Sequence, residues 1–189
     1  MPAMPANLNI FRGCRIALAA VVMLCAVSFA ADEGAPAPQT LCTGQEAAIF
    51  SCSVLSGKIV SLCASPDLSR NSGYLQYRYG HSADSLELQF PKDARRADDT
   101  FKFMQQYFAK GGTTALSFWV GPYRYSVFRT TSAFGFNGAG IIVSRDSRRV
   151  AYMRCNDKTI VTDDDRLSEL PTAGIPDANG DVSYVGAEQ

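Results

Sequence analysis

Apolar and polar residues alternate with a period of two along most of the chain, which is the pattern of half-buried β-strands. In residues 74–79, leucine and tyrosine alternate strictly with Gln76 and Arg78. The segments that carry such a pattern, or a run rich in Val and Ile, are Ala47–Val54, Ile59–Cys63, Tyr74–Tyr79, Leu86–Phe90, Ala115–Val120, Tyr123–Thr130, Ile141–Ser144 and Arg149–Cys155. Short turns separate them, and consecutive strands usually pair. The sequence therefore predicts a mainly β fold, an antiparallel meander of about eight strands forming a barrel or a sandwich.

The first two predicted strands flank Ser56-Gly57-Lys58-Ile59, in which Gly57 stands at the first central position of a type II′ turn. A hairpin centred on this turn places Cys52 opposite Cys63. Because a slip of one residue changes the face of every side chain, this register depends on the turn alone.

Residues 92–110 fit two patterns. Asp98 and Asp99 can cap a helix with Phe103 and Tyr107 on one side, ended by Gly111-Gly112. Phe101 and Phe103 also alternate as in a strand, and the pattern slightly favours an extended start.

The N-terminus has the three parts of a secretory signal peptide. Arg12 and Arg15 precede the apolar run Ile16–Ala31, and Ser28-Phe29-Ala30 offers a small-x-small cleavage site. The run is shorter than the roughly 20 residues of a membrane span. The expected organisation is a signal peptide over residues 1–30, a flexible leader over 31–41, one β domain over 42–157 and an acidic, loosely ordered tail over 158–189. The mature protein is expected to be periplasmic or secreted, without a stable membrane span.

Cleavage removes Cys14 and Cys25 and leaves Cys42, Cys52, Cys63 and Cys155. An even number of cysteines in an oxidising compartment predicts two disulfides, but the three possible pairings stay open. No C-x2-C pair exists and His81 is the only histidine, so neither a zinc site nor another cofactor is expected.

The charges, 18 basic and 18 acidic, balance over the whole chain. Counting by segment, residues 31–156 hold 14 Lys and Arg against 10 Asp and Glu, whereas residues 157–189 hold 2 against 8. A body with a net charge of only +4 does not have the basic density of a nucleic-acid-binding protein.

Three strings carry a resemblance: Phe50–Cys52, Gly57–Ser65 and Gly73–Gly80, with Tyr123–Phe128 and Arg154-Cys155 in support. Together they resemble an uncharacterised family of secreted proteobacterial proteins, which implies a small exported domain and no established activity. A weaker likeness is to periplasmic lysozyme inhibitors, which present a loop that plugs the lysozyme cleft. Val120–Tyr123 stands where those inhibitors carry a small Ser-Gly-Ala loop.

Catalytic patterns are weak. His81 lies in a loop without a legible partner for acid–base catalysis, and Glu46 and Glu87 are expected to face solvent rather than a cleft. Asp163-Asp164-Asp165 and Asp177–Asp181 lack the spacing of an EF-hand, so solvated acidic turns are the simpler interpretation. An enzyme is therefore not expected.

The hairpin around residues 119–129 is the predicted binding region, formed by Trp119, Tyr123, Arg124 and Arg129. If Leu116 and Phe118 face the core, Trp119 is exposed, and an exposed Trp indicates a contact site. Core packing is favoured for the alternating aromatics Tyr123, Tyr125 and Phe128.

These patterns predict an exported, non-enzymatic binding protein whose partner is an envelope component or a lysozyme-type enzyme. The alternatives are a hydrolase acting on cell-envelope substrates and a purely structural periplasmic protein.

Overall fold

A computed structural model describes residues 39–97, 100–135 and 137–178. The predicted signal peptide, the leader up to residue 38, the aspartates at 98 and 99 and residues 179–189 lie outside these ranges. In the described residues, no helix has the length and apolar character needed to cross a membrane.

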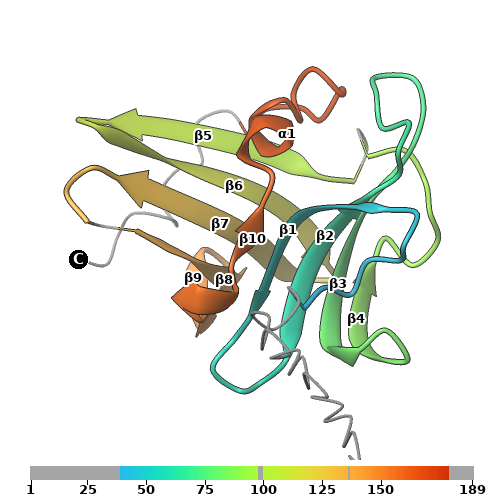
Figure 1. Cartoon of the computed structure of the whole chain (residues 1–189), viewed down its shortest axis with the longest axis horizontal. Coiled ribbons are helices and arrows are strands. Elements are labelled where there is room, and N and C mark those ends of the chain that lie inside the picture. Colours follow the sequence, from blue (N-terminus) through green and yellow to red (C-terminus); the bar gives the residue numbers. More distant parts are fainter. Residues whose placement is uncertain (1–38, 98–99, 136, 179–189) are drawn as a thin grey trace, which may run out of the picture. The chain divides into compact units, whose positions relative to one another are not determined.

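The chain forms two antiparallel five-stranded sheets (Figure 1). Sheet I has the order β10-β1-β2-β3-β4 and sheet II the order β5-β6-β7-β8-β9. The strands are β1 (Ala47–Ser53), β2 (Ile59–Ala64), β3 (Leu75–Ser82), β4 (Ser85–Phe90), β5 (Lys102–Phe108), β6 (Gly111–Val120), β7 (Tyr123–Ser132), β8 (Gly138–Arg145), β9 (Arg148–Arg154) and β10 (Val161–Thr162).

The mainly β, antiparallel prediction is confirmed, but the described residues form ten strands instead of eight. The additional strands are β5, which shows that residues 102–108 of the ambiguous segment are extended, and β10. The barrel alternative is wrong. β4 and β5 follow each other in the chain but are edge strands of different sheets, because Pro91 and the irregular segment after it end the first meander.

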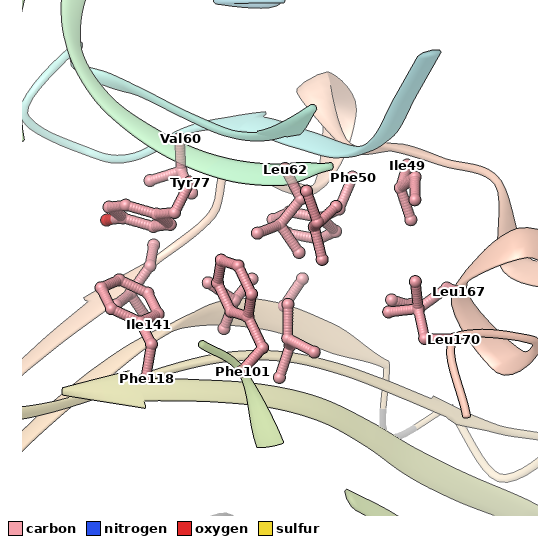
Figure 2. Packing of buried hydrophobic residues seen from close by; sticks show 14 of the residues in the cluster. Ile49, Phe50, Val60, Leu62, Tyr77, Phe101, Phe118, Ile141, Leu167 and Leu170 are labelled. Carbon is pink, nitrogen blue, oxygen red and sulfur yellow. The ribbon is translucent and has the colours of Figure 1, made fainter. Parts of the chain in front are cut away.

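The core lies between the two sheets (Figure 2). Phe50, Leu62 and Tyr77 project from sheet I, and Phe118 and Ile141 from sheet II. The rings of Tyr77 and Phe118 are 4.8 Å apart between centroids. Burying these side chains supplies the main stabilisation of a β-sandwich, because each is removed almost completely from water.

The register of the first hairpin differs from the prediction. Cys52 lies opposite Val60, and Cys63 lies opposite Ala48. The turn is longer than two residues: the Val54 N–H donates to the Lys58 carbonyl next to the Ser53–Ile59 pair, so residues 55–57 form the loop. Gly57 still has the positive φ of 80° that made it a turn residue.

Two disulfides join Cys42 to Cys63 and Cys52 to Cys155. The second links β1 to the end of β9, so it connects the two sheets across 103 residues of chain. Next to it, Cys155 also forms a backbone bridge with Val54. The prediction of two bridges is confirmed, and both disulfides fit an extracellular or periplasmic protein.

The prediction of a loosely ordered tail is wrong over residues 158–178. After the short 3₁₀ helix η1 (Asp157–Thr159), β10 pairs with β1, and α1 (Asp164–Ser168) follows. Leu167, Leu170 and Ile175 belong to the core. These three residues are buried, but they are spaced irregularly in an acidic stretch. The sequence therefore shows no periodic pattern that predicts their burial.

Candidate binding surface

The β6–β7 hairpin places Trp119 directly opposite Arg124, on the face of sheet II that points away from the core. Leu116 and Phe118 occupy the core face and are buried. Trp119 remains 45% exposed. The conditional prediction that a buried Leu116–Phe118 face leaves Trp119 exposed is therefore confirmed.

Arg124 holds the Trp119 ring in place. Its guanidinium carbon lies 5.3 Å from the ring centroid, within the range of a cation–π interaction. Arg124 itself is buried, and its Nη2 donates a hydrogen bond to Ser117 Oγ at 3.2 Å. Ser117 Oγ is in turn 2.8 Å from Ser126 Oγ on β7. The result is an exposed indole that rests on a side chain fixed to the sheet.

The other two predicted binding residues lie on the opposite face of β7. Tyr123 packs against the core and has the guanidinium of Arg145 at 5.8 Å from its ring centroid. Arg129 is half-buried on the same face, six residues further along the strand. The structure thus brings Trp119 and Arg124 together and separates both from Tyr123 and Arg129.

The aromatic residues of β7 are divided by the same alternation. Tyr125 stacks on Phe118 in the core, with centroids 5.3 Å apart. Phe128 faces outward with Trp119, but it is buried in a small cluster with Met104, Ala115 and Ile142. Tyr125 therefore packs in the core as predicted, whereas Phe128 is buried beneath the outer surface of sheet II.

Two outward residues of β9 extend this surface and were not predicted. Tyr152 is 48% exposed and stacks on Phe128 with centroids 6.1 Å apart. The guanidinium carbon of Arg149 lies 5.7 Å from the Tyr152 ring. We call Trp119, Arg124, Phe128, Arg149 and Tyr152 the outer strip. Arg149 and Tyr152 lie on the same face as Trp119 because of the way β8 pairs with β7 and β9. Alternation within a single strand does not reveal this alignment.

The residues considered for acid–base catalysis, His81, Glu87 and Glu46, do not belong to the outer strip. His81 is exposed at the end of β3, and Glu87 forms an exposed ion pair with Lys58 at 2.8 Å. Glu46 was expected to face solvent, but its side chain is only 2% exposed. Residues 39–46 run beside sheet I, where Arg78 Nη1 donates to the Leu41 carbonyl and Ser51 Oγ donates to the Gln39 carbonyl.

Glu46 accepts two hydrogen bonds from Arg78, at 2.7 and 2.8 Å. The Thr43 amide and the Tyr74 hydroxyl donate to the same carboxylate. Burial alone raises the pKa of Glu46, but the hydrogen bonds from Arg78, Thr43 and Tyr74 outweigh it and hold the pKa below its ordinary value. The carboxylate is thus fully engaged in a structural network and is unsuited to accept a substrate proton.

No cluster of three or more His, Cys, Asp or Glu side chains within the described ranges has the geometry of a metal site. Asp163 instead caps α1, because its carboxylate accepts a hydrogen bond from the Arg166 amide. A cavity of about 340 Å³ lies between the 66–70 loop and the α1 region, with Ile49 and Leu170 among its apolar walls and Arg70, Arg166 and Glu169 among its polar ones.

Searches against protein-family models, curated proteins and solved structures found no match to this chain.

Proposed function

We propose that this chain is an exported, non-enzymatic binding protein that contacts a protein partner through the outer strip. The observation that carries the proposal is the geometry of Trp119, a half-exposed indole supported by a buried arginine. Tryptophan, tyrosine and arginine are the residues most enriched among those that dominate binding energy at protein interfaces. The outer strip contains all three.

Rigidity supports this function. A side chain that is already fixed before binding loses little conformational entropy when the partner arrives. Trp119 rests on Arg124, and Tyr152 rests on Phe128, so both exposed rings have one face held by the sheet. The exposed parts of the two rings are the natural contact area for a partner.

The partner class remains that of the sequence-based hypothesis: an envelope component or a lysozyme-type enzyme. The positive charge of Arg124 and Arg149 favours a partner surface that carries carboxylates. A direct assay separates the two candidates, because inhibition of purified lysozymes requires no other component. Inhibition that is lost in Trp119→Ala supports the lysozyme-type partner, and no effect on several lysozyme types removes it.

Site-specific photocrosslinking tests the broader proposal. A photoreactive amino acid replaces Trp119 in the exported protein, and a second protein carries it at Leu55, which is 84% exposed in the β1–β2 turn. We expect one discrete crosslinked partner from position 119 and none from position 55. Equal products from both positions, or none from position 119, contradict the proposal.

A further inference from the structure

One edge of sheet II is formed by β9, which pairs with β8 on one side. In the described part of the chain, no backbone group bonds to the other side of this strand. Every residue of β9 except Met153 is exposed. An exposed edge of this kind offers a row of backbone donors and acceptors to another extended chain.

The edge is held in place at both ends. The tight turn after Arg145 joins β9 to β8, and Asp146 and Ser147 adopt positive φ there. At its other end the chain enters the Cys52–Cys155 disulfide. A strand fixed in this way loses little entropy when a further strand pairs with it.

The charges of β9 select what can pair with it. Arg148 and Arg154 stand at its two ends, with Arg149 beside the first and Arg145 across the turn. Asp146 and Asp157 lie near this group, 3.6 Å from Arg145 and 3.1 Å from Arg154, and leave it with a net positive charge. Arg145 and Arg154 each remain about half exposed.

The same charges disfavour a second copy of the chain. Antiparallel pairing of two β9 strands over their full length sets Arg148 directly opposite Arg154 at both ends. Like charges directly opposite across strands are destabilising. The strand is therefore protected against its own copy and is matched to an extended segment with acidic side chains.

We propose that β9 is a docking edge for an extended acidic segment of a protein partner, which adds to sheet II as a sixth strand. Backbone hydrogen bonds supply the attachment, and the arginines of β9 select glutamate or aspartate on the added strand. This edge shares Arg149 and Tyr152 with the outer strip, but it binds through the backbone groups of β9. The proposal therefore does not require Trp119 to contact a partner.

The test uses the oxidised protein and capped peptides of the same length as β9, 7 residues. In one peptide glutamate alternates with valine, in a second lysine replaces glutamate, and a third is the glutamate peptide with a central proline. We expect only the first to bind with measurable affinity, and alternate amides of β9 to become protected from hydrogen exchange.

Variants locate the contact. Arg148→Glu combined with Arg154→Glu is expected to weaken the glutamate peptide by about tenfold or more, because cross-strand ion pairs become repulsive. Arg70→Glu combined with Arg166→Glu changes the net charge equally at exposed positions on other segments and is expected to leave binding within about twofold. Trp119→Ala is expected to leave it unchanged.

Three results overturn the proposal. Equal weakening by the two charge-reversed pairs shows nonspecific attraction, and loss of binding in Trp119→Ala moves the peptide to the outer strip. The third result is that the glutamate peptide does not bind, while a variant with Arg148→Ser and Arg154→Ser self-associates. The arginines of β9 would then serve only to prevent aggregation through this edge.

Discussion

At the scale of single residues, the ion pair between Glu46 and Arg78 shows how burial changes the role of a carboxylate. Alternation marked Glu46 as a surface residue, yet the segment that contains it lies against sheet I and its side chain is buried. Each oxygen of the carboxylate accepts at least two hydrogen bonds. A buried pair that is so completely satisfied is costly to break from one side.

Glu46→Gln is expected to lower the unfolding free energy at neutral pH by about 3 kcal/mol, because it leaves Arg78 buried without its counter-charge. The folded-state pKa of Glu46 is lowered, so its stabilising contribution is present above the unfolded-state pKa of about 4.3 and is lost as pH falls through the folded-state value. The unfolding free energy, measured with urea between neutral and acidic pH, should therefore fall less steeply with decreasing pH in the variant than in the wild type.

Glu87→Gln is the matched control, because it removes a carboxylate from an exposed ion pair. Its expected effect is below about 1 kcal/mol. If the unfolding free energy of Glu46→Gln falls with decreasing pH as steeply as that of the wild type, protonation of Glu46 is not coupled to folding, and the prediction is contradicted.

Arg124 is expected to determine the environment of Trp119, the single tryptophan of the chain. Arg124→Ala removes the cation that covers one ring face, so the fluorescence should shift to the red and become more accessible to acrylamide. Arg145→Ala, which removes the cation over Tyr123, is the control and should leave the emission unchanged. An unshifted spectrum in Arg124→Ala contradicts the supported geometry of the indole.

At the scale of elements, the strands were predictable and their pairing was not. Alternation locates β3 and β7 because one face of each must be apolar. The register of the first hairpin depends on how many residues form the turn. The pattern predicts a two-residue turn, whereas in the structure residues 55–57 form a three-residue turn closed by the hydrogen bond from Val54 to Lys58. A second irregularity, between Ala48 and Phe50, lies in the same pair of strands.

The same limit applies to the binding region. Trp119 was predictable from its own strand, since its neighbours Leu116 and Phe118 define the core face. Tyr152 was not, because its place beside Phe128 depends on the alignment of β7, β8 and β9. Tyr123 and Arg129 were grouped with Trp119 by proximity in sequence, although alternation sends them to the opposite face of β7.

The C-terminal segment is an integral part of the fold. Leu170 is fully buried and contacts the core although no strand or helix contains it. Leu170→Ala is expected to lower the unfolding free energy by about 3 kcal/mol, as for other large-to-small core substitutions. Leu55→Ala, at an exposed turn, should change it by less than about 0.5 kcal/mol. Equal denaturation midpoints for the two variants contradict the placement of Leu170.

At the scale of the whole molecule, the two disulfides close loops of very different length. Cys52–Cys155 spans 103 residues and connects the sheets, whereas Cys42–Cys63 spans 21 and lies within one region of sheet I. On the chain-entropy model, the longer loop contributes about 1.4 kcal/mol more. Replacing both cysteines of the longer bridge with alanine should therefore lower the denaturation midpoint more than replacing those of the shorter one, and the reverse order contradicts this assignment.

The central claim is that the outer strip binds a partner, and affinity for the partner captured at position 119 tests it most directly. Trp119→Ala should weaken binding by about 30-fold, the effect of losing about 2 kcal/mol at an interface centre. Tyr107→Ala removes a ring that is 76% exposed on β5 and should change affinity by less than about twofold. Unchanged affinity in Trp119→Ala, or equal losses in both variants, contradicts the account.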